Sequence, residues 1–226
     1  MSSIKLSSQI DFSKIQFQSP TLNSYGGKMA KVTYDEKWAL IQTPSLKCPF
    51  GLNIYDDADS KTYSFDVSIN KNIPKEDEFL NFLKTLEDQL ITHVSENSQE
   101  WIDSDEGSKD VCKALLRSSL KYSRDKQTKK FSDKYPPRIK VSVPFYENEM
   151  KFKAYQTNDG EMKEIKTMEE LEQLMKNSIV TLILRYDRIT FNGGKYGFKF
   201  TLQQLRINST GKTNMFNEPA FIEDNE

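Results

Sequence analysis

Residues 178–207 read SIVTLILRYDRITFNGGKYGFKFTLQQLRI and predict two long β-strands joined by a tight turn. The strands are expected at 178–189 and 195–207, because β-branched and aromatic residues dominate both segments. FNGG stands between them, and Gly193 and Gly194 allow the positive φ angles of a tight hairpin turn. Side chains alternate across a strand. The predicted core face of the second strand carries Tyr196, Phe198, Phe200 and Leu202.

Further strands are predicted upstream of this hairpin. Residues 28–43 predict a hairpin that turns at Asp35–Glu36, because apolar runs flank two residues typical of turns. Two more strands are expected at 50–55 and 62–69, with alternating apolar residues in the second. The N-terminal half is therefore expected to be rich in short antiparallel strands.

Helices are predicted at three places. Pro74 opens the clearest one, over 74–94, where apolar residues recur at spacings of three and four and acids occupy the first turn. Shorter helices are expected at about 108–116 and 167–175.

The C-terminal half suggests a small barrel. RIKVSVPFY (138–146) is predicted to pair with MKFKAYQT (150–157) across Glu147–Glu149, and the helix at 167–175 and the long hairpin follow. This order of strand, strand, helix, strand, strand fits a closed barrel with a helix at one end. We expect an α+β fold, in which an OB-like antiparallel β-barrel is elaborated by an N-terminal β-hairpin region and a long helix.

The predicted domain organisation has one main unit. An N-terminal segment (1–24) precedes a single OB-like domain (25–210), which carries a helical insertion at about 74–116 and a basic loop at 117–137. Residues 211–226 are expected to form an acidic, disordered tail.

Composition and rare residues exclude several classes of function. The 226 residues include 29% charged side chains, and no stretch approaches a membrane span or a secretory signal, so an intracellular protein is expected. Cys48 and Cys112 lie in no metal-binding motif and are predicted to be buried thiols. His93 is the only histidine, so we expect no metal site, no cofactor and no catalytic triad.

The net charge of -1 hides a strong segregation of charge along the chain. Residues 55–110 hold fifteen acids and five bases. Residues 117–153 hold eleven bases and four acids, and residues 180–212 hold six bases and one acid. Both basic stretches contain Tyr and Phe. Such asymmetry allows a nearly neutral protein to present a phosphate-binding face.

The first basic stretch predicts a binding site for single-stranded nucleic acid. Proteins of that kind combine cations for the phosphates with aromatic faces for the bases. A solvated linker with incidental charge is the alternative. The candidate residues here are Lys121, Tyr122, Arg124, Lys126, Lys129, Lys130, Phe131, Lys134, Tyr135, Arg138 and Lys140.

The closing hairpin supplies the second group of candidates. Lys195, Gly197 and Lys199 are expected on its outer face, where the glycine would leave room for a strand to approach closely. A half-exposed strand with solubilising lysines is the alternative. The candidates of this group are Arg185, Arg188, Phe191, Lys195, Tyr196 and Lys199.

Other patterns support no site. Gly211-Lys212-Thr213 lacks the first glycine of a phosphate-binding loop. Paired acids in the turn-rich region 55–110 are typical of a solvated surface, and a metal-dependent nuclease is a distant alternative. Trp38 and Trp101 are predicted to be core or lobe-packing residues.

Three motifs carry a resemblance to a known family. They are YGGKMAKVTYDEKWALIQTPSLKCPFGL (25–52), KYPPRIKVSVPF (134–145) and FNGGKYGFKFTLQQLRI (191–207), in that order. Together they resemble the OB-fold single-stranded DNA-binding proteins of nucleocytoplasmic large DNA viruses. Where relatives often carry tryptophans in the closing hairpin, this chain has Thr190 and Phe200. Stacking at Thr190 is therefore expected to pass to Phe191 or Tyr196.

The resemblance implies a non-enzymatic protein that binds single-stranded DNA in viral replication, recombination or repair. It implies a host cytoplasm (viral factory) or nuclear location, with packaging in the virion as a further option. The acidic tail is a candidate docking segment for replication or repair proteins. A protein-interaction or virion structural module is the alternative. Preference for DNA or RNA, site size, cooperativity and oligomeric state stay open.

Overall fold

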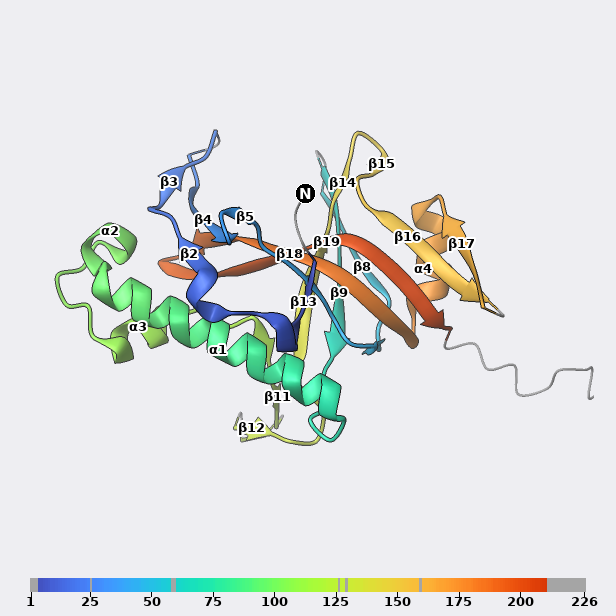
Figure 1. The fold of residues 1–226 in the computed structure, drawn as a ribbon, viewed down its shortest axis with the longest axis horizontal. Helices are drawn as coiled ribbons and strands as arrows, with labels where there is room; N and C mark the ends of the chain where they lie inside the picture. The colour runs from blue at the N-terminus through green and yellow to red at the C-terminus, as the bar shows by residue number, and fades with distance from the viewer. Residues whose placement is uncertain are drawn as a thin grey trace, which may run out of the picture.

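The computed structural model describes residues 4–24, 26–57, 60–125, 127–128, 130–158 and 160–210 (Figure 1). The first strands are β1 (Lys5–Leu6), β2 (Ile15–Phe17), β3 (Thr21–Leu22), β4 (Lys28–Tyr34), β5 (Lys37–Trp38), β6 (Leu40–Gln42), β7 (Leu46–Cys48), β8 (Leu52–Asp57) and β9 (Ser60–Ser68). The helices are α1 (Pro74–Glu96), α2 (Ser98–Ile102), α3 (Lys109–Leu115) and α4 (Met168–Met175). The later strands are β10 (Leu120–Lys121), β11 (Ser123–Arg124), β12 (Phe131–Ser132), β13 (Arg138–Val143), β14 (Phe145–Tyr146), β15 (Glu149–Met150), β16 (Lys153–Asn158), β17 (Glu161–Ile165), β18 (Ser178–Asn192) and β19 (Lys195–Ser209).

Five strands close into a barrel. β18 pairs with β7, β7 with β9, β9 with β13 and β13 with β19, and the pairing of β19 with β18 completes the circuit. Only the β13 and β19 pair is parallel. The fold is a mixed α+β structure with a five-stranded barrel, additional strands and a long helix, as the sequence predicted.

The closing hairpin agrees with its prediction and is longer. β18 and β19 each span fifteen residues and meet at a two-residue turn, Gly193–Gly194, whose φ angles are 58° and 72°. Both angles lie in the left-handed region that glycine enters without a steric cost. The turn is therefore shorter than the four residues FNGG, because Phe191 and Asn192 continue the strand pairing.

The strand pairing expected within the C-terminal half is wrong. Residues 138–146 and 150–157 meet only as the two-residue hairpin of β14 and β15. Pro144 interrupts the first strand because proline lacks the N–H that a strand ladder uses. β13 and β16 instead each pair in parallel with β19, and the barrel needs β7 and β9 from the N-terminal half to close.

The N-terminal hairpin is shorter than expected. β4 and β5 turn at Asp35 and Glu36, whose positive φ angles of 51° and 60° fit the predicted turn. After Trp38 the chain leaves β4, and β6 pairs with β18 instead. The three-residue strand β7 was not predicted, because it is bracketed by Pro44 and Pro49.

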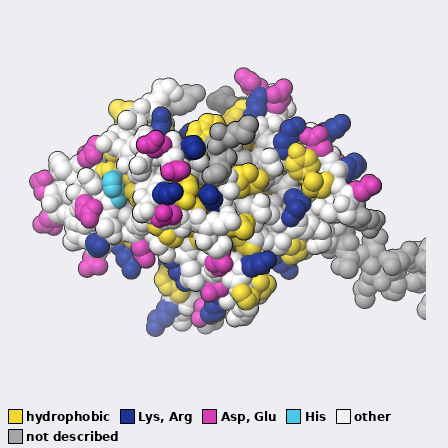
Figure 2. Space-filling model, in the orientation of Figure 1, with side chains coloured by type: hydrophobic (Ala, Val, Ile, Leu, Met, Phe, Trp, Pro, Cys, Tyr) yellow, Lys and Arg dark blue, Asp and Glu magenta, His cyan; other side chains and the backbone are white. Residues whose placement is uncertain are grey.

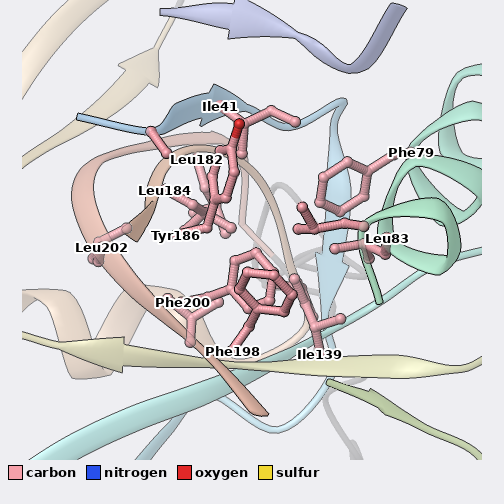
Figure 3. Close-up of a cluster of buried hydrophobic side chains, with 14 of the residues drawn as sticks. Ile41, Phe79, Leu83, Ile139, Leu182, Leu184, Tyr186, Phe198, Phe200 and Leu202 are labelled. Atoms are coloured by element: carbon pink, nitrogen blue, oxygen red, sulfur yellow. The ribbon is translucent and has the colours of Figure 1, made fainter. Parts of the chain in front are cut away.

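The long helix α1 packs into the same core as the barrel. It begins at Pro74, as predicted, and continues two residues beyond the predicted end. Phe79 and Leu83 point into the cluster that contains Phe198 and Phe200 (Figure 3). Burial of each such side chain stabilises the fold by about 1.5–3 kcal/mol. No described helix has the length and apolarity needed to cross a bilayer.

The shorter helices are only partly predictable. α3 and α4 occur where expected, and the side chains of Ser108 and Thr167 accept hydrogen bonds from backbone N–H groups in their first turns. α2 was not predicted. It places the buried Trp101 beside His93, and the two rings lie 5.1 Å apart (centroid to centroid). Acidic side chains lie around this histidine at the helical end of the molecule (Figure 2).

A buried carboxylate holds the chain where it enters the basic loop. Glu87 of α1 accepts hydrogen bonds from the backbone N–H of Ser119 (2.5 Å) and the hydroxyl of Ser118 (2.8 Å). Burial raises the pKa of the Glu87 carboxyl, and the bond from Ser119 partly offsets this. The start of the basic loop is thus tied to α1 rather than free in solvent.

Gly197 is covered by the protein's own chain. The backbone N–H of Arg117 donates to the carbonyl of Tyr196 (2.6 Å), and a Cβ at Gly197 would overlap the Arg117 carbonyl oxygen. The expectation that Gly197 leaves an open surface for nucleic acid is therefore wrong. The glycine admits the segment after α3 against β19.

We predict that G197A destabilises the protein by about 1–3 kcal/mol, because the new methyl group meets backbone rather than a movable side chain. Urea unfolding measures this as a lower midpoint with an unchanged slope. G27A is the matched control, since its methyl group would meet only the flexible Asn23 side chain. Equal midpoints for the two variants would contradict the close approach at Gly197.

Candidate nucleic-acid interface

A cationic groove lies on the outer face of the barrel. Its volume is about 910 Å³, and strands β9, β13, β18 and β19 contribute to its lining. Its cationic side chains are Lys61, Lys140, Lys151, Arg185, Arg188 and Lys199. Glu147 is the only acid that lines it among the described residues. We call this hollow the central groove.

Strand register explains why cations from distant parts of the sequence line up across the outer face of the barrel. Lys31 on β4 pairs with Arg188 on β18, and Arg188 pairs with Lys199 on β19. Lys140 precedes Val141, the β13 residue that pairs with Phe200, and therefore lies beside Lys199. Four neighbouring strands thus place one cation each in a row across the sheet.

A second row beside the cations is small and hydroxylated. Ser64 on β9 pairs with Ser142 on β13, and Ser142 pairs with Thr201 on β19. All three residues line the central groove. Short side chains between long cations leave space for a bulky anionic ligand to approach the sheet.

Two smaller hollows extend the central groove. One, of about 390 Å³, shares Lys140, Ser142 and Lys199 with it and adds Arg117 and Lys121. The other, also of about 390 Å³, shares Trp38, Arg185 and Arg188 and adds Lys31. Shared lining residues make the three hollows one continuous surface.

The cations of the central row are not neutralised within the described part of the chain. Lys140, Arg188 and Lys199 form no ion pair with any described carboxylate. Burial lowers the pKa of the Lys199 ammonium, and Arg188 and Arg185 lower it further by repulsion. Clustered charges of one sign without counter-charges favour an anionic ligand.

Other cations at the rim are held by carboxylates. Arg185 Nε lies 3.2 Å from Asp187 Oδ1. Asp66 forms ion pairs with Arg138 (3.1 Å) and Lys121 (3.5 Å). Hydrogen bonds to Asp66 orient Arg138 and Lys121, and all three ion pairs lower the net charge at the edges of the groove.

The aromatic residues of the basic loop form a separate group. In the β11–β12 hairpin, Phe131 is 69% exposed, the Arg124 guanidinium lies 4.5 Å from its ring centre, and Tyr122 contacts it edge to face. Tyr135 is 60% exposed beside Lys134. This hairpin projects near the start of β13, and β14 and β15 lie near the other end (Figure 1).

Three lysines of the predicted loop lie at or beside gaps in the described chain. Lys130 is exposed in the chain that leads into β12. Lys126 and Lys129 lie outside the described residues. The predicted loop is thus present as an exposed cationic and aromatic hairpin, and it does not line the central groove.

The tip of the closing hairpin does not join the site. Tyr196 is fully buried and donates a hydrogen bond from its hydroxyl to the Cys112 carbonyl (2.8 Å), so its expected stacking role is wrong. Phe191 is half-buried against Trp101, with Lys28 over its ring. Lys195 is exposed beside the turn and lines none of the three hollows.

Trp38 is the main residue that the sequence analysis missed. It was expected to be a core or lobe-packing residue, but it is 56% exposed and lines the central groove, with the Arg185 guanidinium 5.2 Å from its ring centre. Alternation could have shown this, because Ala39 and Ile41 are fully buried and Trp38 points to the opposite side. Lys31, Lys61, Tyr146 and Lys151 were also missed.

Comparison with known proteins places this geometry in context. No protein-family model matches the chain. It is 28% identical over 173 residues to the uncharacterized protein L291 of Acanthamoeba polyphaga mimivirus. The aligned region covers 74% of this chain. The chain spans about a quarter of that protein's length, 25%.

A solved structure shares the architecture. The single-stranded DNA-binding protein of bacteriophage Enc34, in complex with single-stranded DNA, matches with a TM-score of 0.50 and 13% identity. The match covers 85% of this chain and 95% of the phage protein. This chain has the fold of OB-fold single-stranded DNA-binding proteins. The gp2.5 protein of bacteriophage T7 is another match, with a TM-score of 0.47, 10% identity and coverage of 84% and 97%.

The rare titratable side chains of the chain are dispersed or buried in its described part. No cluster of three or more His, Cys, Asp or Glu side chains suited to a metal ion occurs there. Cys48 and Cys112 are buried, and burial raises the pKa of both thiols, that of Cys48 to about 11. Burial also lowers the pKa of His93.

We predict that K199M raises the melting temperature at pH 7. The pKa of Lys199 is lowered in the fold, so the charged lysine costs stability below that pKa, and this cost disappears as pH rises toward 10.5. The gain from K199M should therefore shrink in alkaline solution. K195M, at an exposed position on the same strand, is the control. Thermal unfolding of both variants is measured at pH 7 and in alkaline solution. A lower melting temperature for K199M at pH 7 would argue against uncompensated charge.

Proposed function

We propose that this chain binds single-stranded DNA without reading its sequence and without a catalytic step. The observation that carries the proposal is the row of unpaired cations, Lys140, Lys199 and Arg188, in one groove beside the exposed ring of Trp38. The two basic stretches of the sequence supply these cations together. An unpaired strand can present phosphates and bases to such a surface at the same time.

In this mechanism the cation row neutralises phosphates and Trp38 stacks on a base. Each cation that contacts a phosphate releases a counterion, so affinity falls steeply with salt. Ser142 and Thr201 let the backbone lie close to the sheet. Stacking accepts any base because every base has a π-face, which explains binding without sequence preference.

The β11–β12 hairpin provides a second contact for a longer strand. Phe131 and Tyr135 are exposed, and each lies next to a cation from its own loop. A strand that leaves the central groove along β13 toward its start would reach this hairpin.

The biological role we propose is viral DNA replication, recombination or repair. The three-motif resemblance to proteins of nucleocytoplasmic large DNA viruses and the distant similarity to a mimivirus protein support it. We propose a location where viral DNA is copied, in a cytoplasmic factory or the nucleus, and docking of replication proteins through residues 211–226, which lie outside the described residues. The shared OB fold supports the binding activity, not the pathway.

We predict that the triple variant K140Q/R188Q/K199Q lowers affinity for oligo-dT by at least about tenfold at low salt. Its log–log salt slope should be flatter by about 2, since each lost phosphate contact removes roughly 0.7. Fluorescence anisotropy with labelled dT20 at several salt concentrations measures both quantities.

The matched control for this experiment is K71Q/K84Q/K113Q, which removes the same charge from exposed positions on the helical side of the chain. It should keep most of the affinity. If the two triple variants lose affinity equally, the central groove is not the site. If the wild type itself does not bind dT20, the protein-interaction alternative gains support.

We predict that the loop also contributes to binding. F131A/Y135A should weaken binding of dT20 by about 30-fold or more if both rings stack on bases, because each stack contributes about 1–3 kcal/mol. Binding of a much shorter oligonucleotide held only by the central groove should change little. The loop would be excluded from the interface if dT20 affinity stays the same.

A further inference from the structure

Two groups of three side chains share one arrangement. In each, an aspartate holds an arginine, and the arginine guanidinium lies over the face of an exposed aromatic ring. The first group, the Trp38 triad, is Trp38, Arg185 and Asp187. The second, the Phe50 triad, is Phe50, Arg138 and Asp66.

The distances in the two triads are similar, although Arg138 donates a hydrogen bond to Asp66 while Arg185 Nε has no hydrogen-bond partner among the described residues. The guanidinium carbon lies 5.2 Å from the ring centre of Trp38 and 4.9 Å from that of Phe50. The arginine nitrogen to carboxylate distances are 3.2 Å to Asp187 and 3.1 Å to Asp66. Both rings are 56% exposed. Each aromatic ring therefore has an ion-paired arginine over one face, while most of its surface faces solvent.

The chain around Phe50 keeps the ring outside the core. Pro49 precedes it, and Gly51 follows with a φ of 77°, a left-handed conformation that lets the chain reverse direction there. Cys48, two residues earlier, is fully buried. The turn therefore leaves the ring of Phe50 available for contact with a ligand.

Phe50 lies at the edge of the same outer face that carries the central groove. Arg138, Lys140 and Ser142 alternate with buried residues along β13, so all three project to one side of the sheet. Asp66 of the Phe50 triad pairs with Lys140 in the strand register and binds Lys121, which lines the hollow next to the groove. The Phe50 triad is thus continuous with the cation row.

We propose that Phe50 is a second base-stacking position, and that one strand runs diagonally across the sheet from Trp38, over the cation row, to Phe50. This inference rests on the proposed single-strand binding and adds a residue and a path to it. The arginine of each triad stacks on one face of the ring and fixes it, so little side-chain entropy is lost when a base covers the other face.

The span between the triads suits a short strand. Arg185 and Ser142 are two strands apart, and Ser142 and Arg138 are four residues apart, which gives about 16 Å between the two arginine Cα atoms. Nucleotides stacked with the ~3.4 Å rise of a duplex strand would cover this with about five residues, and an extended strand needs fewer. This length lies within the range of roughly 4–16 nucleotides known for one OB fold.

Intrinsic fluorescence can test the two positions separately. The chain has two tryptophans, and Trp101 is 1% exposed, so quenching of the wild-type protein by oligo-dT reports on Trp38. In the variant W38F/F50W, the reporter moves to the Phe50 position. We expect dT12 to quench this variant, and F50A to weaken dT12 binding by about 5- to 150-fold. Thermal unfolding should first show that each variant is folded.

The control variant is W38F/L22W, which places the reporter at a position that is 73% exposed and lines none of the three hollows. It should not be quenched. Quenching of wild-type protein without quenching of W38F/F50W, together with unchanged affinity of F50A, would overturn the Phe50 inference and leave the proposed function standing. Absence of binding by wild-type protein would instead overturn the proposed function itself.

Discussion

The pairing of β18 with β19 is the interaction on which the rest of the molecule depends. These two strands run together over most of their fifteen residues each, and their other edges hold β4, β6, β7, β13 and β16. One face of the strand pair fills the barrel with apolar side chains. Charged side chains, which the core excludes, therefore lie on the other face. Arg185, Arg188 and Lys199 occupy that outer side, and closure of the barrel brings Lys140 beside them.

This arrangement concentrates positive charge at a cost in stability. The described carboxylates neutralise the cations at the rim, through Asp66 and Asp187, and leave the central row unpaired. The lowered pKa of Lys199 reflects the resulting burial and repulsion. A protein can keep such a row when the core supplies enough stability, and a polyanionic ligand relieves the repulsion on binding. Lys199 is thus expected to lower the stability of the free protein and to raise its affinity for a polyanionic ligand.

Aromatic side chains divide between core and surface according to strand alternation and turn geometry. Tyr196 and Trp101 are buried and hold the helical side of the molecule to the closing hairpin. Trp38 and Phe50 are exposed, and each carries an arginine over its ring. These two exposed rings border the cations. Tyr196, which stands between Lys195 and Gly197 in the sequence, lies in the core instead.

The sequence by itself determined the closing hairpin, its glycine turn, the long helix from Pro74 and the two basic stretches. These features are local: residue alternation, turn conformation and helix periodicity are set by neighbours a few positions apart. Tertiary structure alone decided that β7 and β9 complete the barrel, that Lys140 meets Lys199 and that Arg117 covers Gly197. Those outcomes depend on strand register between segments far apart in the chain, and a single sequence contains no local signal for register at that distance.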